Sequence, residues 1–163
     1  MKIVNIKADK MRYQKNTSAY GLVLLSIATS LIALFTMINF DTFGSGEGTM
    51  RVIPNLRVGV EIALGIVLML STFMAAEKVK YYDPTWSFFG LFILAGINFL
   101  RIFNLPIYAH ERGWIPTKTM QLVMLEFAVT AGLLVVAGII SLRKVIILHK
   151  HLKEIDAYGN DAV

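Results

Sequence analysis

The chain has no cysteine and few charged residues, and both scarcities narrow the class of protein. Without cysteine there can be no disulfides, thiolate metal sites or cysteine nucleophiles. Charged residues make up only 17% of the 163 residues, and 56% are hydrophobic. Soluble domains have about 25% charged residues. The scarcity of charge over long stretches indicates that lipid, rather than water, is the main solvent of this protein.

Catalytic and nucleotide-binding motifs are missing as well. The sequence contains no nucleophile elbow, Walker loop, dinucleotide fingerprint or zinc-protease motif. His149 and His151 are two positions apart and would not share a helical face, so they do not indicate a metal site. The net charge is +5, but the basic residues form no stripe away from the membrane-flanking segments. We therefore expect no enzyme, cofactor, metal site or nucleic-acid partner.

Four apolar stretches are long enough to cross a bilayer, whose hydrocarbon core of about 30 Å needs about 20 helical residues. Backbone groups in lipid must be bonded within their own segment, which favours helices. Short connections make consecutive helices neighbours. The sequence thus predicts an all-α integral membrane four-helix up-down bundle in residues 20–142, with loops at 41–54, 77–84 and 105–117. The stretches run from about Tyr20 to Asn39, Val58 to Ala76, Trp86 to Phe103 and Met120 to Leu142.

The lysines and arginines predict how the bundle is oriented. Eleven of the 16 lie in the N-terminal arm, the second loop and the C-terminal tail, which an up-down bundle puts on one side. Cytoplasmic segments carry the excess of such residues. We therefore expect a multi-pass protein of the cell membrane with both termini in the cytoplasm, a basic arm over residues 1–19 and a helical tail over residues 143–163.

A few polar side chains interrupt the apolar stretches at similar depths. A charge at the bilayer centre costs a few kcal/mol, so such groups face each other, a cavity or the headgroups. Arg57, Glu61, Arg101 and Glu126 all fall in the outer half of the expected bundle, and Asn98 shares a helical face with Arg101. The sequence predicts that these five residues form one polar cluster. It leaves open whether the cluster fixes helix register, binds a proton, ion or small ligand, or contacts another subunit.

These positions resemble a known family. The run 55–57 (Asn-Leu-Arg), Gly65, the pair 100–101 (Leu-Arg) and the pair 125–126 (Leu-Glu) are similar to the pattern of small DoxX-like four-helix membrane proteins. The resemblance spans most of residues 20–143. It departs at Glu61, where a small residue is more usual, and at Leu100, where glycine often precedes the arginine. The activity of that family is not established, so the resemblance implies the fold and no function.

The tail carries an apolar stripe at helical spacing. Val145, Leu148, Leu152 and Ile155 recur every three or four residues, and lysines occupy the other faces. Such a stripe can lie on lipid headgroups, on the protein's own N-terminal arm, or on a cytoplasmic partner. We expect the partner to be another protein subunit.

Two functions are compatible with this pattern. One is a non-catalytic accessory or scaffolding subunit of a larger membrane protein assembly, such as a transporter, with the bilayer and other membrane or cytoplasmic subunits as its partners. The alternative is a small carrier or sensor that binds a polar ligand or proton at the Arg/Glu cluster. A membrane enzyme has no support beyond the location.

Overall fold

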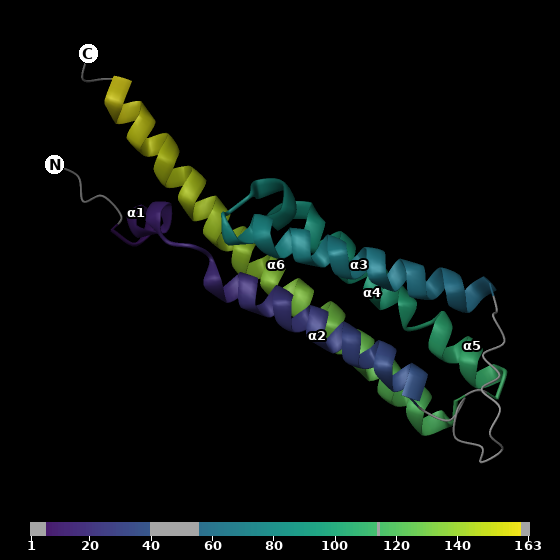
Figure 1. Cartoon of the computed structure of the whole chain (residues 1–163). Coiled ribbons are helices and arrows are strands. Elements are labelled where there is room, and N and C mark those ends of the chain that lie inside the picture. The colour runs from purple at the N-terminus through teal and green to yellow at the C-terminus, as the bar shows by residue number, and fades with distance from the viewer. Residues whose placement is uncertain (1–5, 40–55, 114, 161–163) are drawn as a thin grey trace.

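The computed structural model describes the backbone of residues 6–39, 56–113 and 115–160, and the side chains of residues 8–36, 59–113 and 115–155. Every regular element in these ranges is helical, which confirms the all-α class. Figure 1 shows the order of the elements along the chain. They are α1 (Ile6–Tyr13), α2 (Thr17–Asn39), α3 (Leu56–Lys80), the π-helical turn η1 (Trp86–Gly90), α4 (Leu91–Arg101), α5 (Leu105–Glu111) and α6 (Thr117–Asn160).

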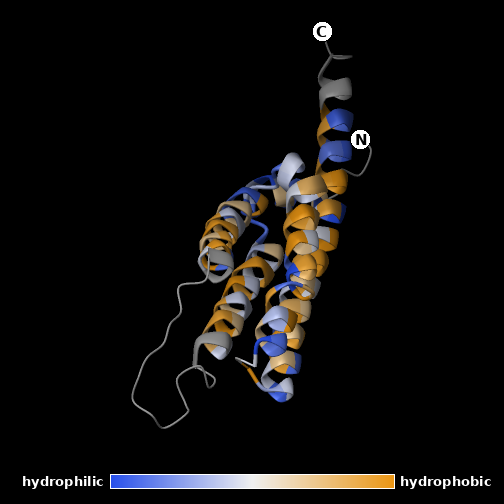
Figure 2. Cartoon of the chain, turned by 90° about the vertical axis from the view of Figure 1, so that its right-hand side faces the viewer, coloured by the Kyte–Doolittle hydropathy of each residue, from blue (hydrophilic) through white to orange (hydrophobic). Residues whose placement is uncertain are grey.

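Four helical segments are long and apolar enough to cross a membrane, as the sequence predicts. Their outward faces carry large exposed apolar side chains such as Leu70, Phe89 and Leu100. Figure 2 shows hydrophobic residues along all the long helices and hydrophilic ones where α6 leaves the bundle. The protein is therefore a multi-pass membrane protein whose outer surface faces lipid. The segments are Thr17–Thr36, Gly59–Lys80, Trp86–Glu111 and Thr117–Ile155.

Contacts between side chains show that α2 and α6 run in opposite directions. Thr29 on α2 meets Thr130 on α6, and Thr36, further along α2, meets Glu126, which comes earlier on α6. Helix α6 packs against α1, α2, η1, α4 and α5, so it is the central helix of the bundle. Figure 1 shows α1 and the end of α6 at one end of the molecule and α5 at the other.

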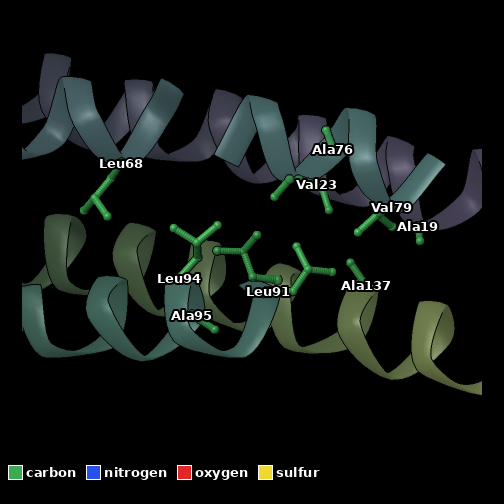
Figure 3. Packing of buried hydrophobic residues seen from close by; sticks show 11 residues of the cluster. Ala19, Val23, Leu68, Ala76, Val79, Leu91, Leu94, Ala95 and Ala137 are labelled. Atoms are coloured by element: carbon green, nitrogen blue, oxygen red, sulfur yellow. The ribbon is translucent and has the colours of Figure 1, made fainter. Parts of the chain in front are cut away.

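Small residues allow the helices to approach closely. The main core cluster joins α2, α3, α4 and α6, and Figure 3 shows its side chains pointing into the space between them. In lipid the hydrophobic effect contributes little to the association of helices. Close packing of small side chains stabilises the association instead. Five alanines of this cluster are buried: Ala19, Ala75, Ala76, Ala95 and Ala137.

The turn after α3 is defined by its own hydrogen bonds. The amide of Asp83 donates to the carbonyl of Lys78 at 3.2 Å, and that of Tyr82 to Val79 at 3.1 Å, which is a Schellman motif. Tyr82 takes the left-handed position of this motif at φ 61°. Asp83 Oδ1 then accepts a hydrogen bond from the Trp86 amide at 3.2 Å, and so caps the next helix. Residues 81–85 therefore form a tight connection between α3 and η1.

The third span differs from its prediction. Its helix is interrupted after Arg101 and resumes as α5, in residues that we expected to be a loop. Pro106 lies in the first turn of α5, where its missing N–H costs no hydrogen bond, so proline does not prevent a helix there. Trp114, residues 40–55 and residues 1–5 lie outside the described part of the chain.

Candidate functional site

A buried ion pair joins the second and third spans. Arg101, the last residue of α4, donates from Nε to Oε1 of Glu61 on α3 at 2.6 Å. Both side chains are only 4% exposed. The sequence prediction that these two charges meet is confirmed. Each of these two buried charges needs the other as its counter-charge, because an uncompensated buried ion costs several kcal/mol.

Asn98 and Phe127 contact the Arg101 guanidinium, and Gly65 leaves room for it. Its Nη1 donates to Asn98 Oδ1 at 3.3 Å, and Asn98 itself donates to the Leu94 carbonyl at 2.9 Å. The Phe127 ring of α6 lies against the cation, with its centroid 4.5 Å from Cζ, a favourable cation–π distance. A Cβ on Gly65 would come within 3.4 Å of Nη2, so the absence of a side chain there makes room for the guanidinium. The site is closed on all these sides.

Glu126 is not part of this ion pair. Its Oε1 accepts a hydrogen bond from Thr36 of α2 at 3.1 Å, and within the described residues its Oε2 is buried without a hydrogen-bond partner. The next residue, Phe127, is the one that meets Arg101. Consecutive helical residues point about 100° apart, so Phe127 faces α4 while Glu126 faces α2. The predicted cluster therefore holds together as Glu61, Asn98 and Arg101, and Glu126 forms a separate polar contact.

Arg57 lies in the first turn of α3, one turn before Glu61. Its side chain is outside the described residues, so its place in the cluster stays a prediction.

A second polar network, at the other end of the bundle, was not predicted. Asn16 Nδ2 donates to Ser141 Oγ at 3.2 Å, Ser141 and Ser87 share a hydrogen bond of 2.7 Å, and Ser87 Oγ donates to the Asp83 carbonyl. Lys144 Nζ donates to Asn16 Oδ1 at 2.8 Å. Asn16, Ser87 and Ser141 are fully buried. Single serines in apolar spans are common, so sequence spacing alone could not identify this network.

The tail stripe packs within the chain. Val145 and Leu148 are buried against Tyr82, and Met11 of α1 and Leu152 border the same cluster. The chain itself covers the side chains of Val145 and Leu148 and part of Leu152. The expected contact of Val145, Leu148, Leu152 and Ile155 with a partner protein therefore stays a prediction, and the first two side chains are not accessible for it. The structure therefore favours the alternative in which the stripe meets the protein's own N-terminal arm.

The environment of Tyr82 follows from this packing. Burial raises the pKa of its phenol above the ordinary value. His151 of α6 is also buried, with Nε2 3.6 Å from Asp9 Oδ1 of α1 and without a hydrogen-bond partner in the described residues.

Comparisons with known proteins identify no relative of this chain. No protein-family model, curated protein or solved structure matches this chain. The resemblance to DoxX-like proteins therefore stays a prediction.

Proposed function

We propose that the protein is a non-catalytic accessory or scaffolding subunit of a larger membrane assembly, such as a transporter. The observation that carries the proposal is the length of α6. Its 44 residues span about 66 Å at 1.5 Å per residue, about twice the hydrocarbon core of a bilayer. Within the described residues, the end that projects packs against α1 and Tyr82. Ile146, Ile147, Lys150 and Lys153 stay exposed on it and are available to another protein.

The orientation belongs to the same proposal. With α1, the turn after α3 and the end of α6 in the cytoplasm, eleven of the 16 lysines and arginines lie on the cytoplasmic side. The exposed face of α6 would then meet a cytoplasmic subunit or the cytoplasmic part of a membrane subunit.

The closed ion pair supports a structural role for the intramembrane charges. Arg101 directs its donors to Glu61 and Asn98, and its face to Phe127. A ligand at this point would have to displace a buried pair, so we assign the pair to bundle stability.

Photo-crosslinking in native membranes tests the accessory role. A photoreactive amino acid replaces Lys150 or Lys153 on the projecting face, and Leu70, which is 61% exposed on the lipid-facing surface of α3, serves as the control position. We expect a discrete crosslink to one other protein from α6, absent from the control, and co-purification of that protein in mild detergent. Crosslinks to lipid or to a second copy alone, with a monomer or homodimer in native detergent, would contradict the proposal.

A specific observation favours the alternative, a carrier or sensor. Within the described residues, Glu126 has one carboxylate oxygen buried without a hydrogen-bond partner. Ionisable residues inside membranes often take part in proton or ion pathways. The substitution Glu126→Gln separates the two functions: lost transport with intact assembly would support the carrier, and altered assembly or stability the accessory subunit.

A further inference from the structure

A groove with a volume of about 440 Å³ lies between α1, the end of α3 and α6. This volume is within the range of about 300–1,000 Å³ that is usual for small-molecule sites. Among its described lining residues are three cations, Arg12, Lys15 and Lys80, and no carboxylate. The groove is therefore suited to an anion.

The lining of the groove also includes apolar side chains. Leu148 and Leu152 of α6 line it together with Met11 of α1. Tyr82 also lines the groove, and burial raises the pKa of its phenol. A lining that combines cations with alkyl groups matches a molecule with an anionic head and an apolar body.

Two of the three cations, Arg12 and Lys15, are only lightly engaged within the chain. Lys15 contacts the Tyr81 ring, with Nζ 5.7 Å from its centroid, and pairs with no carboxylate in the described residues. Arg12 is 3.5 Å from Asp9 with both side chains about two-fifths exposed, an arrangement that contributes little. Lys80 is more firmly held, with both oxygens of Glu77 at 3.1 Å. A ligand phosphate can therefore recruit Arg12 and Lys15 at little cost and share Lys80.

The groove lies at the depth of lipid headgroups. Lys80 is the last residue of the second membrane span, and Tyr81 and Tyr82 follow it directly. Tyrosine rings and basic side chains concentrate where the hydrocarbon meets water. The phosphates of the adjacent leaflet are at this level, and the anionic lipids of a cytoplasmic leaflet attract clustered basic residues.

We propose that this groove binds the headgroup of an anionic phospholipid. Its phosphate lies among Arg12, Lys15 and Lys80, and its glycerol and upper alkyl carbons contact Met11 and Leu148. The site does not depend on a partner subunit, because it needs only α1 with the following Lys15, the end of α3 at Lys80, α6 and the adjacent leaflet.

Native mass spectrometry of the delipidated protein tests the site. The probes are phosphatidylglycerol, phosphatidylcholine and glycerol 3-phosphate, each titrated separately. The test variant is Arg12→Gln with Lys15→Gln. The control variant is Lys10→Gln with Lys150→Gln, which removes the same charge at exposed positions of the same end, outside the groove.

We expect one phosphatidylglycerol to bind at least about tenfold more tightly than phosphatidylcholine, because clustered basic residues attract a lipid with a net negative charge. The test variant should lose most of this preference and the control variant should keep it. Equal binding of the two lipids to the unmodified protein would overturn the proposal without reference to any variant. An equal loss of the preference for phosphatidylglycerol in both variants would show general charge attraction. Tight binding of glycerol 3-phosphate would show that the ligand is a soluble phosphate. Each of these results would also overturn the proposal.

Discussion

The buried Arg101 requires particular residues around it. A charged group inside a membrane bundle needs an opposite charge, further hydrogen bonds and space. Glu61 provides the charge at 2.6 Å, Asn98 an acceptor at 3.3 Å, and Gly65 the space. These residues come from two helices, so the pair also fixes how α3 and α4 are aligned.

Removing one member of the pair should therefore cost more than removing both. We expect Arg101→Leu to lower the free energy of unfolding by about 3–5 kcal/mol, because it leaves Glu61 buried without a counter-charge. The double variant Glu61→Leu with Arg101→Leu should recover most of that loss. Unfolding in mixed detergent micelles measures both. A double variant as unstable as the sum of the two single variants would show that the charges do not interact.

Gly65 should be less tolerant of a side chain than an exposed glycine of the same bundle. We expect Gly65→Leu to lower stability by about 1–3 kcal/mol, because the added carbons occupy the space of the Arg101 guanidinium. Gly96→Leu is the matched control, since a Cβ there meets nothing within 4 Å. The same unfolding assay applies, and equal effects of the two substitutions would mean that Gly65 does not make room for Arg101.

At the scale of helices, hydropathy was enough to predict the four spans but not their details. An apolar run of about 20 residues has to be a helix in lipid, so the existence of each span followed from composition. The break after Arg101 and the helix α5 did not follow, because proline permits a first turn as well as a loop. The Schellman turn was also hidden, since its left-handed position is held by Tyr82 rather than by glycine.

The partial success at the polar cluster has a geometric reason. Depth in the membrane follows from counting residues at 1.5 Å each, and it brought Glu61 and Arg101 to the same level correctly. The direction in which a side chain points around its helix depends on which neighbour packs where, and counting cannot supply this. Glu126 has a compatible depth but faces α2, where Thr36 meets it.

Helix α1 should stay on α6 only as long as their shared apolar cluster is intact. We expect Leu148→Gln to release α1, because a buried amide without a partner costs about 1–3 kcal/mol. Trypsin should then cleave after Lys10, Arg12 or Lys15 about tenfold faster in the otherwise folded protein. Lys150→Gln, an exposed change on the same helix, is the control. Unchanged cleavage in Leu148→Gln would show that this cluster does not hold α1.

The whole molecule has two ends with different character. One end holds the closed ion pair between α3 and α4. The other holds the buried network of Asn16, Ser87 and Ser141, the packed α1 and the projecting part of α6. Most of the basic residues belong to this second end, and our proposals for a partner and for a lipid both require that it faces the cytoplasm.

Labelling of single cysteines tests this orientation most directly, and the chain has no cysteine of its own to interfere. Tyr13→Cys and Lys150→Cys report on the end with α1, and Arg112→Cys reports on the end with α5; all three positions are exposed. In intact cells, a membrane-impermeant maleimide should label only Arg112→Cys, and all three should react after the membrane is opened. Labelling of Lys150→Cys or Tyr13→Cys in intact cells would contradict the account.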